Sequence, residues 1–193
     1  AHQDLHVLSW FTPYVKVWMV VSAAEAFTIV ILATRIVRGL VHPPTPKHLL
    51  LMVSLLLLFA PATGFAFFQL IYAERMLTLC FVAFAFFYLH YQSTGGRQAW
   101  CFSLLFALVG MFFKDIAVLL FVTPAAFTLM AGAAGLMDRY PAFPAHNLTV
   151  KRLRNWMGAY SLELWLMSLM VVFALAYTYL SYLPSLYHGK EAY

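Results

Sequence analysis

Long apolar runs separated by short polar turns make up most of this chain. Runs such as "LLLMVSLLLLFA" and "LCFVAFAFFYL" are continuous rather than alternating, which indicates helices and not the strands of a membrane β-barrel. Several runs approach the roughly 20 residues that a helix needs to cross a bilayer. The pattern predicts an all-α polytopic membrane protein with about six transmembrane helices, at residues 13–36, 49–71, 77–91, 99–113, 116–137 and 160–183.

The composition supports this interpretation. Of the 193 residues, 64% are hydrophobic and 10% are charged, whereas soluble domains carry about 25% charged residues. So few polar groups cannot cover a water-facing surface, and we expect an integral membrane protein. The location expected for it is a bacterial inner (plasma) membrane. One transmembrane domain is expected over residues 1–193. Because the chain begins at Ala1 rather than Met, the alternative is that it is a fragment of a longer protein.

The placement of the basic residues predicts sidedness. Lys and Arg concentrate in cytoplasmic loops, so the net charge of +5 does not indicate a nucleic-acid partner. If successive turns alternate sides, one side receives Arg35, Arg38, Lys47, Arg97, Arg139, Lys151, Arg152 and Arg154. The other side receives Lys16, Arg75, Lys114 and Lys190. The first side is therefore predicted to be cytoplasmic, both termini external, and residues 138–159 a cytoplasmic basic loop.

Two short external turns each carry an adjacent pair of opposite charges. These pairs are Glu74–Arg75 in "YAER" and Lys114–Asp115 in "KD". Near the headgroup boundary, Arg75 and Lys114 could bind the phosphate of an anionic ligand, while Glu74 and Asp115 orient the cations or transfer protons. The simpler alternative is that any hairpin turn needs polar residues and that Lys and Arg anchor helix ends by snorkelling.

Glu25 lies near the middle of the first predicted span. An ionisable group there is expensive and suggests a function. The alternative is a protonated glutamate hydrogen-bonded to a neighbouring helix, because the small residues around it, among them Ser22, favour close helix packing. Glu163, at the start of the sixth span, is interpreted as a helix-end residue.

No cofactor is expected from the remaining polar residues. Neither cysteine lies in a zinc-binding spacing, and only His90 is close to a span, which argues against haem. His2 and His6 have an i/i+4 spacing that would place both on one helical face, where they could hold a metal ion. In the basic loop, "VKRLRNW" is either an amphipathic segment on the inner headgroups or a plain topology signal.

Residues 72–127 resemble part of the multi-spanning GT-C glycosyltransferases. The resemblance rests on "YAERMLTLCFVAFAFFYLHY" and "GMFFKDIAVLLFVTPAAF", in which an external "ER" turn opens one helix and a later "KD" turn opens an apolar helix. It implies sugar transfer from a polyprenyl-phosphate carrier at the external face. Asp4 would then be the catalytic base, and Glu74, Arg75, Lys114 and Asp115 would bind the substrate.

Two other classes of function remain open. The chain could be a non-catalytic membrane subunit whose charged turns contact other subunits. It could also be a small transporter element that uses Glu25 as its coupling acid. In each case the partners include membrane lipids.

Overall fold

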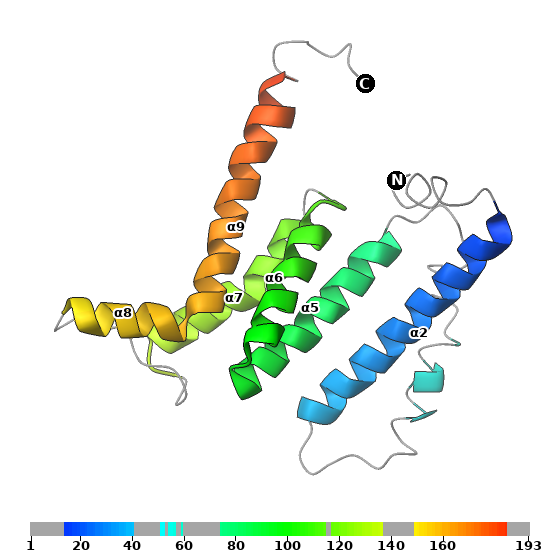
Figure 1. Cartoon of the computed structure of the whole chain (residues 1–193), viewed down its shortest axis with the longest axis horizontal. Helices are drawn as coiled ribbons and strands as arrows, with labels where there is room; N and C mark the ends of the chain where they lie inside the picture. The colour runs from blue at the N-terminus through cyan, green and yellow to red at the C-terminus, as the bar shows by residue number, and fades with distance from the viewer. Residues whose placement is uncertain are drawn as a thin grey trace. The chain divides into compact units, whose positions relative to one another are not determined.

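The computed structural model describes residues 14–40, 51–52, 54–56, 59, 74–114, 117–136 and 149–184. Every regular element in these ranges is helical. The elements are α2 (Val15–Leu40), α5 (Glu74–Thr94), α6 (Arg97–Met111), α7 (Ala117–Ala133), α8 (Val150–Ala159), α9 (Ser161–Tyr177) and the π-helical turn η1 (Thr178–Tyr182) (Figure 1). The chain divides into two compact units, Ala1–Ala117 and Val118–Tyr193, which are described separately.

Three described helices are long and apolar enough to cross a membrane. They cover Lys16–Leu40, Arg75–Thr94 and Ser161–Leu180 and coincide with the first, third and sixth predicted spans. The apolar helices α6 and α7 have 15 and 17 residues, fewer than the roughly 20 that a bilayer core requires. The structure is therefore compatible with an integral membrane protein. The six crossings and the external termini stay predictions, and most of residues 49–71 lies outside the described residues.

In the first unit, α5 and α6 form an antiparallel hairpin with a two-residue turn. Gly95 adopts φ 68°, a left-handed conformation that is costly for residues with a Cβ atom. Its N–H donates to the carbonyl oxygen of Tyr91 at 2.8 Å, which closes the end of α5. Gly96 then returns the chain to extended backbone before α6 begins at Arg97.

The hairpin is closely packed because one face of α6 carries small residues. Ala99, Ser103, Ala107 and Gly110 are among its buried positions and follow the helical repeat. Small side chains let two helix backbones approach closely without relying on hydrophobic exclusion of water. Larger rings pack beside this stripe, where Phe87 of α5 stacks on Phe102 with ring centroids 4.9 Å apart.

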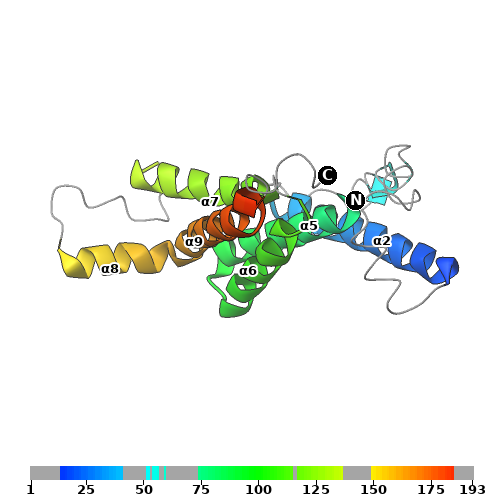
Figure 2. The same ribbon diagram turned by 90° about the horizontal axis from the view of Figure 1, so that it is seen from above.

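Helices α2 and α5 lie side by side and run in the same direction (Figures 1 and 2). The predicted second span, residues 49–71, lies between them in the sequence and falls largely outside the described residues. One described residue of that segment lies beside α2, since the hydroxyl groups of Ser54 and Thr34 are hydrogen-bonded at 2.7 Å.

In the second unit, α8 and α9 meet at a sharp bend centred on Tyr160 (Figure 1). The Tyr160 side chain is fully buried and its ring lies 4.9 Å from that of Trp156. It also approaches α7 at Gly132, where a Cβ atom would lie 2.6 Å from the Tyr160 Cζ atom. Glycine at residue 132 is therefore what allows the bend to contact α7.

We predict that Gly132→Ala lowers the stability of the second unit by about 1–3 kcal/mol, the usual cost of overpacking. The rigid phenol ring, rather than a flexible chain end, would have to move. Retention of the monodisperse peak after heating in detergent, followed by fluorescence-detected size exclusion, measures the effect. Gly158→Ala is the matched control, because a Cβ atom there meets nothing within 4 Å. Equal melting of both variants would contradict the packing described for Gly132.

Candidate functional site

Arg75 lies in the first turn of α5 and is buried, with 3% of its surface exposed. Its Nη1 group donates a hydrogen bond to the Oγ atom of Ser22 on α2. Ser22 is also buried, and its hydroxyl donates to the carbonyl oxygen of Trp18 at 2.9 Å. The first residue of one candidate span is thus joined by its side chain to the interior of another.

The contact exists because α2 presents small residues toward α5. Ser22 and Ala26 are buried one helical turn apart, which leaves room for a long side chain from the neighbouring helix. The Ser22 hydroxyl is neutral, so it orients the guanidinium without cancelling its charge. A permanent positive charge is therefore held inside the packed end of α2 and α5.

Glu25 lies three residues after Ser22, on an adjoining part of the same helical surface, and is half-buried. Arg75 is the only buried arginine of the described residues, and Glu25 lies one turn along α2 from the serine that this arginine contacts.

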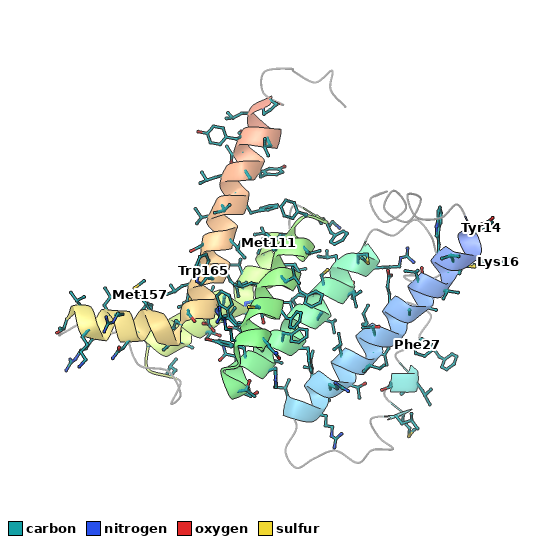
Figure 3. The ribbon with its side chains drawn as sticks, in the orientation of Figure 1. Tyr14, Lys16, Phe27, Met111, Met157 and Trp165 are labelled. Atoms are coloured by element: carbon teal, nitrogen blue, oxygen red, sulfur yellow. The ribbon has the colours of Figure 1, made fainter. Side chains whose placement is uncertain are left out.

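Lys114 lies at the same end of the first unit as Arg75. The antiparallel hairpin carries the chain from Arg75 down α5 and back up α6, whose end at Met111 is labelled in Figure 3. The turn after Met111 is held by the N–H groups of Phe112 and Phe113, which donate to Val109 and Gly110 at 3.3 and 3.2 Å.

Unlike Arg75, Lys114 is exposed. The N-terminal end of α2, where Lys16 is labelled, also lies at this end (Figure 3). We call the region formed by Lys16, Ser22, Glu25, Arg75 and Lys114 the charged end of the first unit.

The structure describes only part of the predicted site. Glu74 begins α5, but nothing is described of its side chain, and Asp4 and Asp115 lie outside the described residues. His2 and His6 also lie outside. Among the described residues, no group of three or more His, Cys, Asp or Glu is placed to hold a metal ion. Sequence reasoning treated Ser22 only as a small packing residue and missed its contact with Arg75.

A buried acidic residue lies in the other unit. Glu163 occupies the first turn of α9 and has no exposed surface. Its position agrees with the prediction of a helix-end residue, since the helix N-terminus favours a negative charge. Burial, and then the charge of Glu163, raise the pKa of the neighbouring Tyr160 phenol above its ordinary value. Tyr160 and Glu163 are thus both fully buried at the start of α9.

Comparison of the chain with protein-family models, curated proteins and solved structures finds no match. The assignment of a function therefore rests on the residues and the geometry of the charged end.

We predict that cysteines at residues 22 and 75 are joined by a short bifunctional thiol cross-linker. The pair Ser22→Cys/Arg75→Cys would be tested in a background in which Cys80 and Cys101 are replaced by serine, since both are free thiols. The matched control is Ser22→Cys/Thr94→Cys, because Thr94 lies at the opposite end of α5, roughly 28 Å from Arg75 at 1.5 Å per residue. Mobility on a denaturing gel reports the link. Equal linking of both pairs, or of neither, would contradict the parallel arrangement of α2 and α5.

Proposed function

We propose that this chain is an integral membrane glycosyltransferase, or part of one, that takes its sugar from a polyprenyl-phosphate carrier. In this proposal Arg75 and Lys114 bind the carrier phosphate at the external membrane face. The resemblance of residues 72–127 to GT-C enzymes suggests the chemistry. The observation that carries the proposal is the α5–α6 hairpin, which returns Lys114 to the end of the unit where Arg75 is held.

A phosphate of a lipid carrier would enter at the headgroup boundary, where the candidate span Arg75–Thr94 begins. Charge-assisted hydrogen bonds from Arg and Lys are the usual partners of such a group. The Ser22 contact fixes the direction of the Arg75 guanidinium, while the exposed Lys114 can adjust to the ligand. Glu74 and Asp115, next in sequence to the two cations, would orient them.

The proposed reaction is a displacement at the anomeric carbon of the sugar. Asp4 accepts the proton of an acceptor hydroxyl, and the hydroxyl oxygen forms a bond to that carbon. The bond between the carbon and the phosphate oxygen breaks, and the electron pair leaves with the polyprenyl phosphate. Arg75 and Lys114 stabilise the added charge on the leaving phosphate, the kind of electrostatic stabilisation that contributes most to many enzymatic rates.

We predict that Arg75→Gln and Lys114→Gln each weaken the binding of polyprenyl phosphate roughly tenfold or more. The estimate follows from about 1.5–3 kcal/mol for a hydrogen bond to a charged group. Titration of the purified chain in nanodiscs with undecaprenyl phosphate, followed by native mass spectrometry, gives the affinities. Arg97→Gln is the matched control, because Arg97 is exposed at the opposite end of the same hairpin.

Undecaprenol, which lacks the phosphate, is the control ligand. It should bind weakly and equally to all variants. Loss of binding to both lipids would indicate damage to the fold, and unchanged phosphate binding in both variants would overturn the proposal.

One observation favours the transporter alternative: Glu25 is half-buried within the candidate span Lys16–Leu40. The two functions differ in what Asp4 and Glu25 do. A glycosyltransferase needs Asp4 for turnover, whereas a transporter element needs Glu25 for proton coupling.

We predict that Asp4→Asn abolishes sugar transfer by membranes containing the protein but leaves the binding of undecaprenyl phosphate unchanged. Removing the base stops proton transfer without touching the phosphate contacts. Transfer of a radiolabelled sugar from polyprenyl-phosphate donors measures turnover. Glu25→Gln should retain transfer at a reduced rate. If the asparagine variant retains full transfer, Asp4 is not the base. If Glu25→Gln instead retains full sugar transfer but loses proton-coupled uptake of a solute into proteoliposomes, the transporter alternative is correct.

A further inference from the structure

Helix α8 has an apolar face that no described part of the protein covers. None of its ten residues is buried. Val150, Leu153 and Met157 have 84%, 36% and 50% of their surface exposed, although all three are large and apolar. Their spacing of three and four residues places them on one side of the helix.

The basic residues of α8 are arranged around this face. At 3.6 residues per turn, Arg152 and Arg154 lie at its two edges and Lys151 lies on the opposite side, and all three are exposed. Trp156 falls within the apolar face, close to the Arg152 edge. Arginines at the edges of an apolar face can bury their aliphatic stems and keep their charges in water.

The position of α8 in the chain is equally informative. Its last residue, Ala159, is separated by Tyr160 alone from the candidate span Ser161–Leu180. The end of α8 is therefore held where that span enters the membrane, and the bend at Tyr160 turns α8 away from the direction of α9 (Figure 1). With ten residues, α8 is about 15 Å long, half of what a bilayer core requires.

We infer that α8 lies in the plane of the membrane surface and binds anionic phospholipids. Val150, Leu153 and Met157 enter the boundary between headgroups and acyl chains. Lys151, Arg152 and Arg154 contact lipid phosphates, as basic residues of interfacial helices do. A second copy of α8 is a poorer occupant of the apolar face, because its own three positive charges would be brought close to these.

This inference does not depend on the proposed glycosyl transfer. It concerns a different unit of the chain and a lipid headgroup rather than a carrier phosphate. It also gives the polar stretch before α9 a physical role, since an in-plane helix fixes both the depth and the tilt of the span that follows it.

The position of α8 is tested by spin labels on the full chain. Single substitutions Lys151→Cys, Leu153→Cys, Asn155→Cys and Met157→Cys would be made without Cys80 and Cys101 and reconstituted in nanodiscs that contain phosphatidylglycerol. Power saturation compares the access of oxygen, which dissolves in the bilayer, with that of a water-soluble nickel chelate. Labels at 153 and 157 should favour oxygen and labels at 151 and 155 the nickel chelate. Equal access at all four residues would overturn the inference, as would protection of 153 and 157 from both reagents, which indicates a protein partner.

The lipid preference is tested by neutralising the basic residues. The triple variant Lys151→Gln/Arg152→Gln/Arg154→Gln should lose its preference for phosphatidylglycerol over phosphatidylcholine, by about fivefold for each charge removed. Native mass spectrometry of the protein released from mixed nanodiscs gives the ratio of the two retained lipids. Arg97→Gln, which removes an exposed charge from the other unit, should change this ratio little. An unchanged ratio in the triple variant would overturn anionic lipid binding by α8.

Discussion

Arg75 carries a permanent positive charge into the contact between α2 and α5. There the oxygen of the Ser22 hydroxyl accepts a hydrogen bond from the guanidinium. In apolar surroundings, a guanidinium is stable only where polar groups can bind it, because burying a charge without polar partners costs free energy. The contact therefore sets which faces of the two helices meet and which ends lie together. It joins the start of α5 to the N-terminal part of α2, two helices that run in the same direction.

The hairpin of α5 and α6 determines where the next charged turn, at Lys114, lies relative to Arg75. Gly95 permits a reversal in two residues, and the small residues of α6 allow close packing along the return. As a result Lys114 comes back to the end where Arg75 is buried, one cation exposed and the other oriented by a neighbouring helix. A site for a phosphate at a membrane boundary needs both properties, geometric precision and access, and the proposed function is built on their combination.

In the second unit, a basic helix directly precedes a candidate membrane span. Tyr160 and Glu163 are buried at the start of α9, and Gly132 leaves space for the Tyr160 ring against α7. This packing stabilises the bend between α8 and α9. Because of the bend, no described part of the protein covers the apolar face of α8. A segment predicted as part of a basic loop over residues 138–159 thus contains a helix over its last ten residues, whose amphipathic character suits a membrane surface.

The apolar runs by themselves determined that the described chain is helical and contains segments able to span a membrane, because continuous hydrophobic length is a local property. The short turns at Gly95 and after Met111 could likewise be located from their polar and glycine residues. What the tertiary structure decided was the partner of each polar group. Ser22 lies 53 residues before Arg75, and no local pattern states which face of one helix will meet the start of another. Such pairing depends on close packing between small residues of separate helices, a property of the assembled unit.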